Sequence, residues 1–95
     1  MYAVFTEVSA DESQLEAVRG FLRRVAVPRA RQAGVKAGYW LAPQNGRGVS
    51  VSIYDTEDEA RGWAARLEVG KPPMSEAPAG VTVKSVEVRE VIASV

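Results

Sequence analysis

The order of its periodic segments constrains the fold of this chain more than any other feature of the sequence. Two stretches with the 3.6-residue spacing of amphipathic helices each lie between stretches whose side chains alternate as they do in strands. The order is therefore strand, helix, strand, strand, helix, strand within 95 residues. A chain of this length has room for one hydrophobic core. We expect a single α+β domain over residues 1–95.

The first helix pattern begins after two candidate caps, Ser9 with Glu12 three residues on, and Asp11. An apolar stripe follows, formed by Leu15, Val18, Phe21, Leu22 and Val25. Pro28 lacks an N–H and biases Val27 away from helical backbone, which predicts a kink or a break near Val27. A short second segment is expected to end at Gly34.

The second helix pattern is the cleaner of the two. Thr56 and Glu59 have capping-box spacing, and four acidic residues lie near the start of the helix, where its dipole favours them. One face carries Ala60, Trp63, Ala64 and Leu67. The stretch Val69–Gly80 then contains three of the five prolines and has no periodicity. Loops of this length are often functional or mobile.

Four segments have the composition and alternation of strands, namely Tyr2–Val8, Val35–Ala42, Val49–Tyr54 and Val81–Ala93. The Asn-Gly pair at residues 45–46 predicts a tight hairpin between the second and third of them. In the last strand the apolar phase shifts between Val83 and Val86. This shift indicates either a β-bulge near Ser85 or a strand that leaves one sheet to pair elsewhere.

Both faces of the predicted strands carry large apolar side chains. Phe5 alternates with Tyr2 and Val4, and Trp40 alternates with Tyr39 and Leu41. Two helices on one face of a four-stranded antiparallel sheet leave the other face uncovered, and an uncovered apolar face is typical of an interaction surface. We therefore expect a homodimer in which two sheets pack together. Alternation alone does not tell which face forms this interface.

The composition argues against several kinds of binding and catalysis. The chain has no cysteine and no histidine, so we expect no cofactor, no metal site, and no haem ligation of the usual kind. Twelve basic residues balance twelve acidic ones, and the third predicted strand lacks the aromatic platform that stacks bases, so no nucleic-acid partner is expected. The first residues resemble neither a signal peptide nor a membrane span, which predicts a cytoplasmic protein without membrane contact.

The predicted order is that of a ferredoxin-like fold, and the chain resembles the dimeric α+β barrel superfamily, which includes the antibiotic-biosynthesis monooxygenases. The resemblance covers nearly the whole chain. It depends on the element order and on two passages, Arg29–Trp40 from the first helix into the second strand and Ile53–Ala60 from the third strand into the second helix. It implies a homodimer with a cavity between the helices and the sheet.

The resemblance also implies a function, a small apolar pocket that takes a small aromatic ligand without assured catalysis. The expected lining residues are Trp63, Trp40, Tyr39 and Tyr54. Trp63 also fits a purely structural role, because it lies on the apolar stripe of its helix.

A second function stays open, that of a cofactor-independent monooxygenase acting on an aromatic metabolite. Oxygenase members of the superfamily bind polycyclic phenols or haem, and they commonly use an asparagine on the first strand, a tryptophan and, in the haem-degrading branch, a histidine. Trp63 matches the tryptophan, but the first strand has no asparagine and the chain no histidine. Catalytic residues are therefore unassigned. A polar group in the cavity that can deprotonate a phenol, with Glu7 and Tyr54 as candidates, would distinguish this enzyme from a binding protein.

Overall fold

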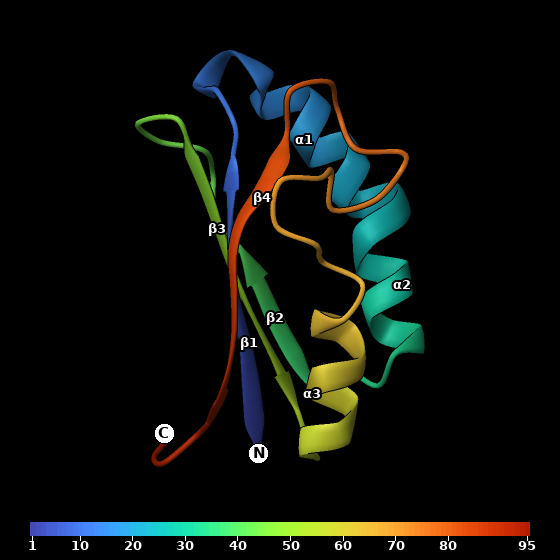
Figure 1. Ribbon diagram of the computed structural model, residues 1–95, viewed down its shortest axis with the longest axis vertical. Coiled ribbons are helices and arrows are strands. Elements are labelled where there is room, and N and C mark those ends of the chain that lie inside the picture. The colour runs from blue at the N-terminus through green and yellow to red at the C-terminus, as the bar shows by residue number, and fades with distance from the viewer.

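The structure, a computed structural model that describes all of residues 1–95, contains one four-stranded antiparallel sheet with the helices on one face (Figure 1). The strands are β1 (Tyr2–Ser9), β2 (Ala37–Trp40), β3 (Arg47–Tyr54) and β4 (Thr82–Glu90). Their order across the sheet is β2-β3-β1-β4. The predicted α+β class and antiparallel sheet are confirmed, and the strand order is compatible with a ferredoxin-like fold.

The helical part of the chain consists of two bodies. The first, which we call the long helical segment, covers residues 12–32 and is made of η1 (Glu12–Gln14), α1 (Leu15–Phe21), the π-helical turn η2 (Leu22–Ala26) and α2 (Val27–Gln32). The second is α3 (Glu57–Ala64). Neither body is long and apolar enough to cross a lipid bilayer.

The predicted kink or break near Val27 is wrong. Val27 keeps helical angles of φ −63° and ψ −47°, and the helix continues through Pro28 to Gln32. The irregularity instead takes the form of the π turn directly before the proline, in which the N–H of Val27 donates to the carbonyl oxygen of Leu22. In a π turn the N–H donates to the carbonyl oxygen five residues back instead of four. This change of partner lets the helix continue through Pro28, which has no N–H to donate.

The local signals for helix starts and for the hairpin are mostly confirmed. Of the two candidate caps, Asp11 is correct, because its Oδ1 accepts from the N–H of Ser13 at 2.8 Å. Ser9 belongs to β1 instead, and its hydroxyl lies 2.9 Å from that of Thr82. Asn45 and Gly46 have φ of 54° and 75°, as a type I′ hairpin turn requires.

The register of the sheet confirms the predicted bulge. Glu7 lies opposite Ser85 and Val8 lies opposite Val83, so Lys84 is the extra residue in β4. The bulge restores the apolar residues of β4 to the helix side of the sheet, where Val83 is wholly buried.

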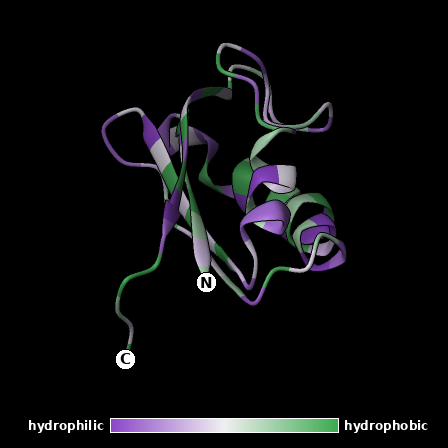
Figure 2. Cartoon of the chain, turned by 60° about the horizontal axis from the view of Figure 1, so that its bottom comes forward, coloured by the Kyte–Doolittle hydropathy of each residue, from purple (hydrophilic) through white to green (hydrophobic).

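The core lies between α3 and the sheet. It is formed by Val4, Ala30, Tyr54, Ala60, Trp63, Leu67 and Val83. α3 packs directly on β1, β3 and β4, whereas the long helical segment stands farther from the strands. Hydrophobic residues, shown in green in Figure 2, lie along the strands as well as on the helices. The wider gap beneath the long helical segment positions the candidate site.

Candidate functional site

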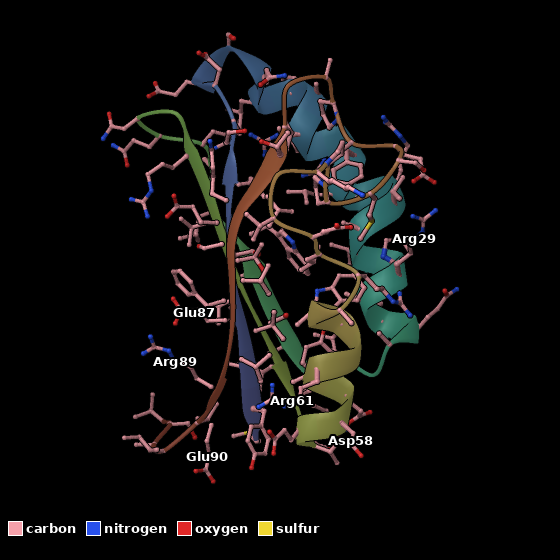
Figure 3. All side chains as sticks on the ribbon, in the orientation of Figure 1. Arg29, Asp58, Arg61, Glu87, Arg89 and Glu90 are labelled. Carbon is pink, nitrogen blue, oxygen red and sulfur yellow. The ribbon has the colours of Figure 1, made fainter.

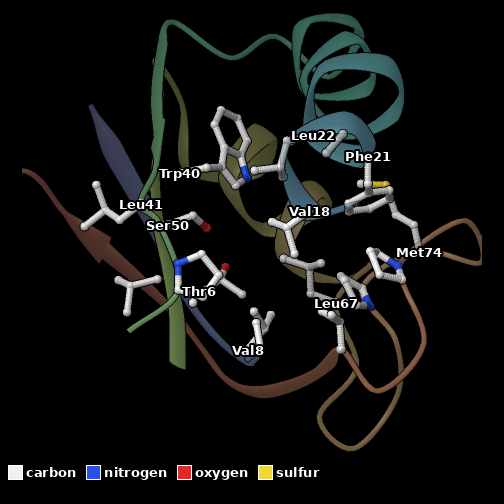
Figure 4. Close-up of a pocket in the computed structure, with 18 of the residues that line it drawn as sticks. Thr6, Val8, Val18, Phe21, Leu22, Trp40, Leu41, Ser50, Leu67 and Met74 are labelled. Atoms are coloured by element: carbon white, nitrogen blue, oxygen red, sulfur yellow. The ribbon is translucent and has the colours of Figure 1, made fainter. Parts of the chain in front are cut away.

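A cavity of about 70 Å³ lies between the helix-side face of the sheet and the long helical segment. Thr6, Val8 and Ser50 lie on its sheet side, and Val18, Phe21 and Leu22 lie across from them (Figure 4). Thirteen of its nineteen lining residues are hydrophobic, and none has an ionisable side chain. The cavity is therefore suited to an apolar occupant rather than to a charged one.

Small residues on the inward face of β3 create this space. Gly48, Ser50 and Ser52 point toward the helices, while Val49, Val51 and Ile53 alternate with them. A Cβ atom on Gly48 would lie only 3.0 Å from Cγ2 of Val8, so a larger residue would crowd the sheet there. Gly48 and Ser50 are small enough to leave a hollow that the helix above does not fill.

The structure brings two of the predicted lining residues, Trp40 and Trp63, to this cavity. The ring of Trp40 lies against Gly38, where a Cβ atom would be 2.8 Å from Cζ3 of the indole. Trp63 comes from α3, is 5% exposed, and belongs to the hydrophobic core as well as to the cavity wall. The guanidinium of Arg66 lies 5.3 Å from the centre of its ring, within the range of a cation–π contact.

The other two predicted residues, Tyr39 and Tyr54, lie outside the cavity lining. Tyr39 alternates with Trp40, so it points to the opposite face of the sheet, where it is 63% exposed. Tyr54 is on the same face as Ser50 but four residues further along β3, a distance of about 13 Å. It is wholly buried in the core.

The Tyr54 hydroxyl is buried without a hydrogen-bond partner. Burial in the core raises its pKa. An unpaired buried hydroxyl costs about 1–3 kcal/mol. Replacing Tyr54 with phenylalanine should therefore raise the free energy of unfolding by about 1 kcal/mol, measured by urea denaturation. A lower stability of Tyr54→Phe would show instead that the hydroxyl is paired, for example by a buried water.

Thr6 and Ser50 are the polar side chains of the cavity, and the sequence analysis missed both. They lie directly opposite each other in the β1–β3 register. Serines that alternate with valines along one strand look like a solvent-facing row, because that is where such residues usually lie. No local signal identifies Ser50, because the valines of β3 lie on the face of the sheet that carries no helix.

The loop between α3 and β4, residues 69–80, forms part of the cavity wall through Pro73, Met74 and Pro78. We call it the lid loop, and Figure 1 shows it reaching toward the long helical segment. Two contacts hold it there. Glu76 forms a two-pronged ion pair with Arg29, and the side-chain amide of Gln14 donates to the carbonyl oxygen of Ala79 at 2.7 Å.

The ion pair to Arg29 lowers the pKa of the Glu76 carboxyl to about 2. Because this pKa lies below the unfolded value of 4.5, the contact stabilises the observed position of the lid loop fully above pH 4.5, and this stabilisation is lost as the pH falls through about 2. We expect carbon-detected NMR titration to give Glu76 a midpoint near 2 and Arg29→Gln to return it toward 4.5. A wild-type midpoint close to 4.5 would contradict the contact.

The outer face of the sheet, which carries no helix, is apolar at its centre. Ala3, Phe5 and Val51 line a shallow groove there together with Glu87 and Arg89 of the edge strand β4. Phe5 is 40% exposed, although it is a large apolar residue in the middle of a sheet. Glu87 and Arg89 pair with each other and point away from the helices (Figure 3).

Glu7, a candidate base from the sequence, also lies on the outer face. It accepts a hydrogen bond from Arg47 at 2.7 Å, and this bond lowers the pKa of its carboxyl. No group of three or more Asp and Glu side chains is placed to hold a metal ion. The candidate site combines an apolar cavity with two hydroxyl groups, those of Thr6 and Ser50.

No protein-family model matches the chain, and no curated protein matches it in sequence. The geometry of the cavity and of the outer sheet face therefore carries the functional interpretation.

Proposed function

We propose that the protein binds a small apolar molecule of about one ring in the cavity beneath the long helical segment, and that it does so as a homodimer. The size and lining of the cavity carry this proposal. One water needs ~10–15 Å³ of such space, so the cavity of about 70 Å³ has room for about five waters. A fully enclosed apolar cavity that holds benzene has roughly 150 Å³, so a single ring would fill this cavity and reach into its open mouth. Waters held among mostly apolar walls make few hydrogen bonds, and an apolar ligand would displace them favourably.

The cavity supports binding better than oxygenation. A cofactor-independent monooxygenase acting on an aromatic metabolite needs a group that takes a proton from the substrate. Glu7 faces the other side of the sheet and Tyr54 lies in the core, so neither sequence candidate reaches the cavity. None of the lining residues has an ionisable side chain. Deprotonation of a phenol therefore has no base among the lining residues.

A second copy of the chain is the proposed occupant of the outer sheet face. This matches the resemblance to the dimeric α+β barrel superfamily and the apolar, uncovered centre around Phe5 and Val51. The four strands, of 8, 4, 8 and 9 residues, present a footprint of roughly 460 Å². The accessible surface of such a footprint is of the same order as the ~800 Å² that one partner buries in a stable interface. A two-fold axis would also bring the Glu87–Arg89 pairs of both copies to the interface.

Intrinsic fluorescence provides a direct test of ligand binding, because both tryptophans of the chain line the cavity. We expect single-ring phenols and quinones to change the emission in a saturable way. The variant Ser50→Leu fills the cavity from its sheet side and should abolish the change. Its control, Ser94→Leu, adds the same side chain near the exposed C-terminus and should bind like the wild type. Equal binding by Ser50→Leu, or no binding by the wild type, would refute the proposal.

A further inference from the structure

We propose that Thr6 and Ser50 form a hydrogen-bonding pair that selects the ligand, restricting it to an uncharged molecule of about one ring that carries a hydroxyl or carbonyl group. This inference rests on the proposed binding function and assigns a chemical class to its ligand.

The two side chains are positioned to act on one ligand atom. Thr6 of β1 and Ser50 of β3 are direct cross-strand partners, and both line the cavity (Figure 4). The Cβ atoms of such partners lie about 4.5–5.5 Å apart. A single ligand oxygen held between Thr6 and Ser50 can therefore accept a hydrogen bond from one hydroxyl and form a second hydrogen bond with the other.

Both hydroxyls are free to make these contacts. Thr6 is only 6% exposed, yet neither its hydroxyl nor that of Ser50 takes part in a side-chain hydrogen bond. Ser9 of the same strand differs, because its hydroxyl is bonded to the Gly80 carbonyl and to Thr82. Each hydroxyl can donate one hydrogen bond and accept two. A ligand with one polar group would use the hydrogen-bonding capacity of Thr6 and Ser50 that the protein itself leaves unused.

The charge and size of the cavity restrict the chemical class of the ligand further. With no ionisable side chain in the lining, an ammonium or carboxylate would lose its hydration without gaining a partner of opposite charge. The cavity of about 70 Å³ and its open mouth together take one small ring at most, which excludes a fused ring system. The expected ligand is thus smaller than the polycyclic phenols of the oxygenase members.

Three probes of nearly one shape test the inference: cyclohexanol, methylcyclohexane and cyclohexylammonium. Binding is followed by the indole N–H signals of Trp40 and Trp63 in NMR titrations of the wild type, Thr6→Val and Ser50→Ala. The first substitution keeps the shape of the side chain and the second is conservative, and the same spectra report whether each variant is folded. We expect each variant to weaken cyclohexanol binding by about 5- to 10-fold and to leave methylcyclohexane binding unchanged or stronger. Cyclohexylammonium should not bind.

Two results would overturn the inference while leaving the proposed function intact. One is an equal effect of the substitutions on cyclohexanol and methylcyclohexane, which would show that the hydroxyls do not recognise the polar group. The other is binding of cyclohexylammonium as tight as that of cyclohexanol. If neither neutral probe binds the wild type, the inference and the proposed ligand-binding function both fail.

Discussion

Replacing Trp63 with alanine should lower the free energy of unfolding by about 3 kcal/mol. Trp63 is 5% exposed and packs in the core beside Tyr54 and Leu67, so truncation removes a large buried apolar surface. Loss of a buried tryptophan costs ~3–5 kcal/mol, and the adjoining cavity places this case at the lower end of that range because part of the ring already faces space. A domain of this size is stable by about 5–14 kcal/mol in total.

Urea denaturation of the wild type, Trp63→Ala and Trp63→Phe measures this effect. Trp63→Phe keeps a ring in the core and should cost about 1 kcal/mol, while it changes the cavity wall and hence the binding of planar probes. A loss of less than 1 kcal/mol for Trp63→Ala would contradict the core role of this residue. Unchanged probe binding by Trp63→Phe would argue that its ring does not contact the ligand.

The substitution Val51→Lys should convert the proposed homodimer to a monomer. Val51 lies between Phe5 of β1 and Tyr39 of β2 on the outer face, at the centre of the expected interface. Two-fold symmetry would bury the added charge twice, and a cost of about 2 kcal/mol per copy raises the dissociation constant roughly 1,000-fold.

Sedimentation equilibrium at micromolar concentration provides the measurement. The wild type should sediment as a dimer of the 10.2 kDa chain and Val51→Lys as a monomer. Gln44→Lys, which adds the same charge in the exposed hairpin, should remain dimeric. A monomeric wild type, or a Val51→Lys variant that stays dimeric, would contradict the assignment of the outer face as the interface.

Local signals in the sequence were enough to predict most of the fold. Alternation, capping by Asp11 and Thr56, and the Asn45-Gly46 turn each depend on residues close together in the chain, and the structure contains all of them. The bulge in β4 could also be predicted, because a phase shift in the apolar pattern is visible without knowing the partner strand. The predicted break at Val27 was wrong, because the missing N–H of Pro28 is accommodated by a π turn, which is rarer than a kink or a helix end.

The site was harder to predict, because it depends on which face of the sheet the helices cover. When both faces of the strands carry apolar residues, the sequence does not tell which face the helices cover. If the helices covered the other face, every inward residue would become an outward one. Trp40 therefore lines the cavity whereas its neighbour Tyr39 is exposed. The gap itself depends on the distance of the long helical segment from the strands, which no local pattern encodes. Thr6 and Ser50 became recognisable only once that gap was known.

The cavity, rather than the exposed outer face, is the proposed binding site for a small ring compound. Intermolecular NOEs between a bound single-ring probe and the methyl groups of the protein test it most directly. We expect NOEs to the methyl groups of Thr6, Val18, Leu22 and Met74, which come from three walls of the cavity. NOEs confined to Ala3 and Val51 on the outer face, or none at a saturating concentration of the probe, would contradict it.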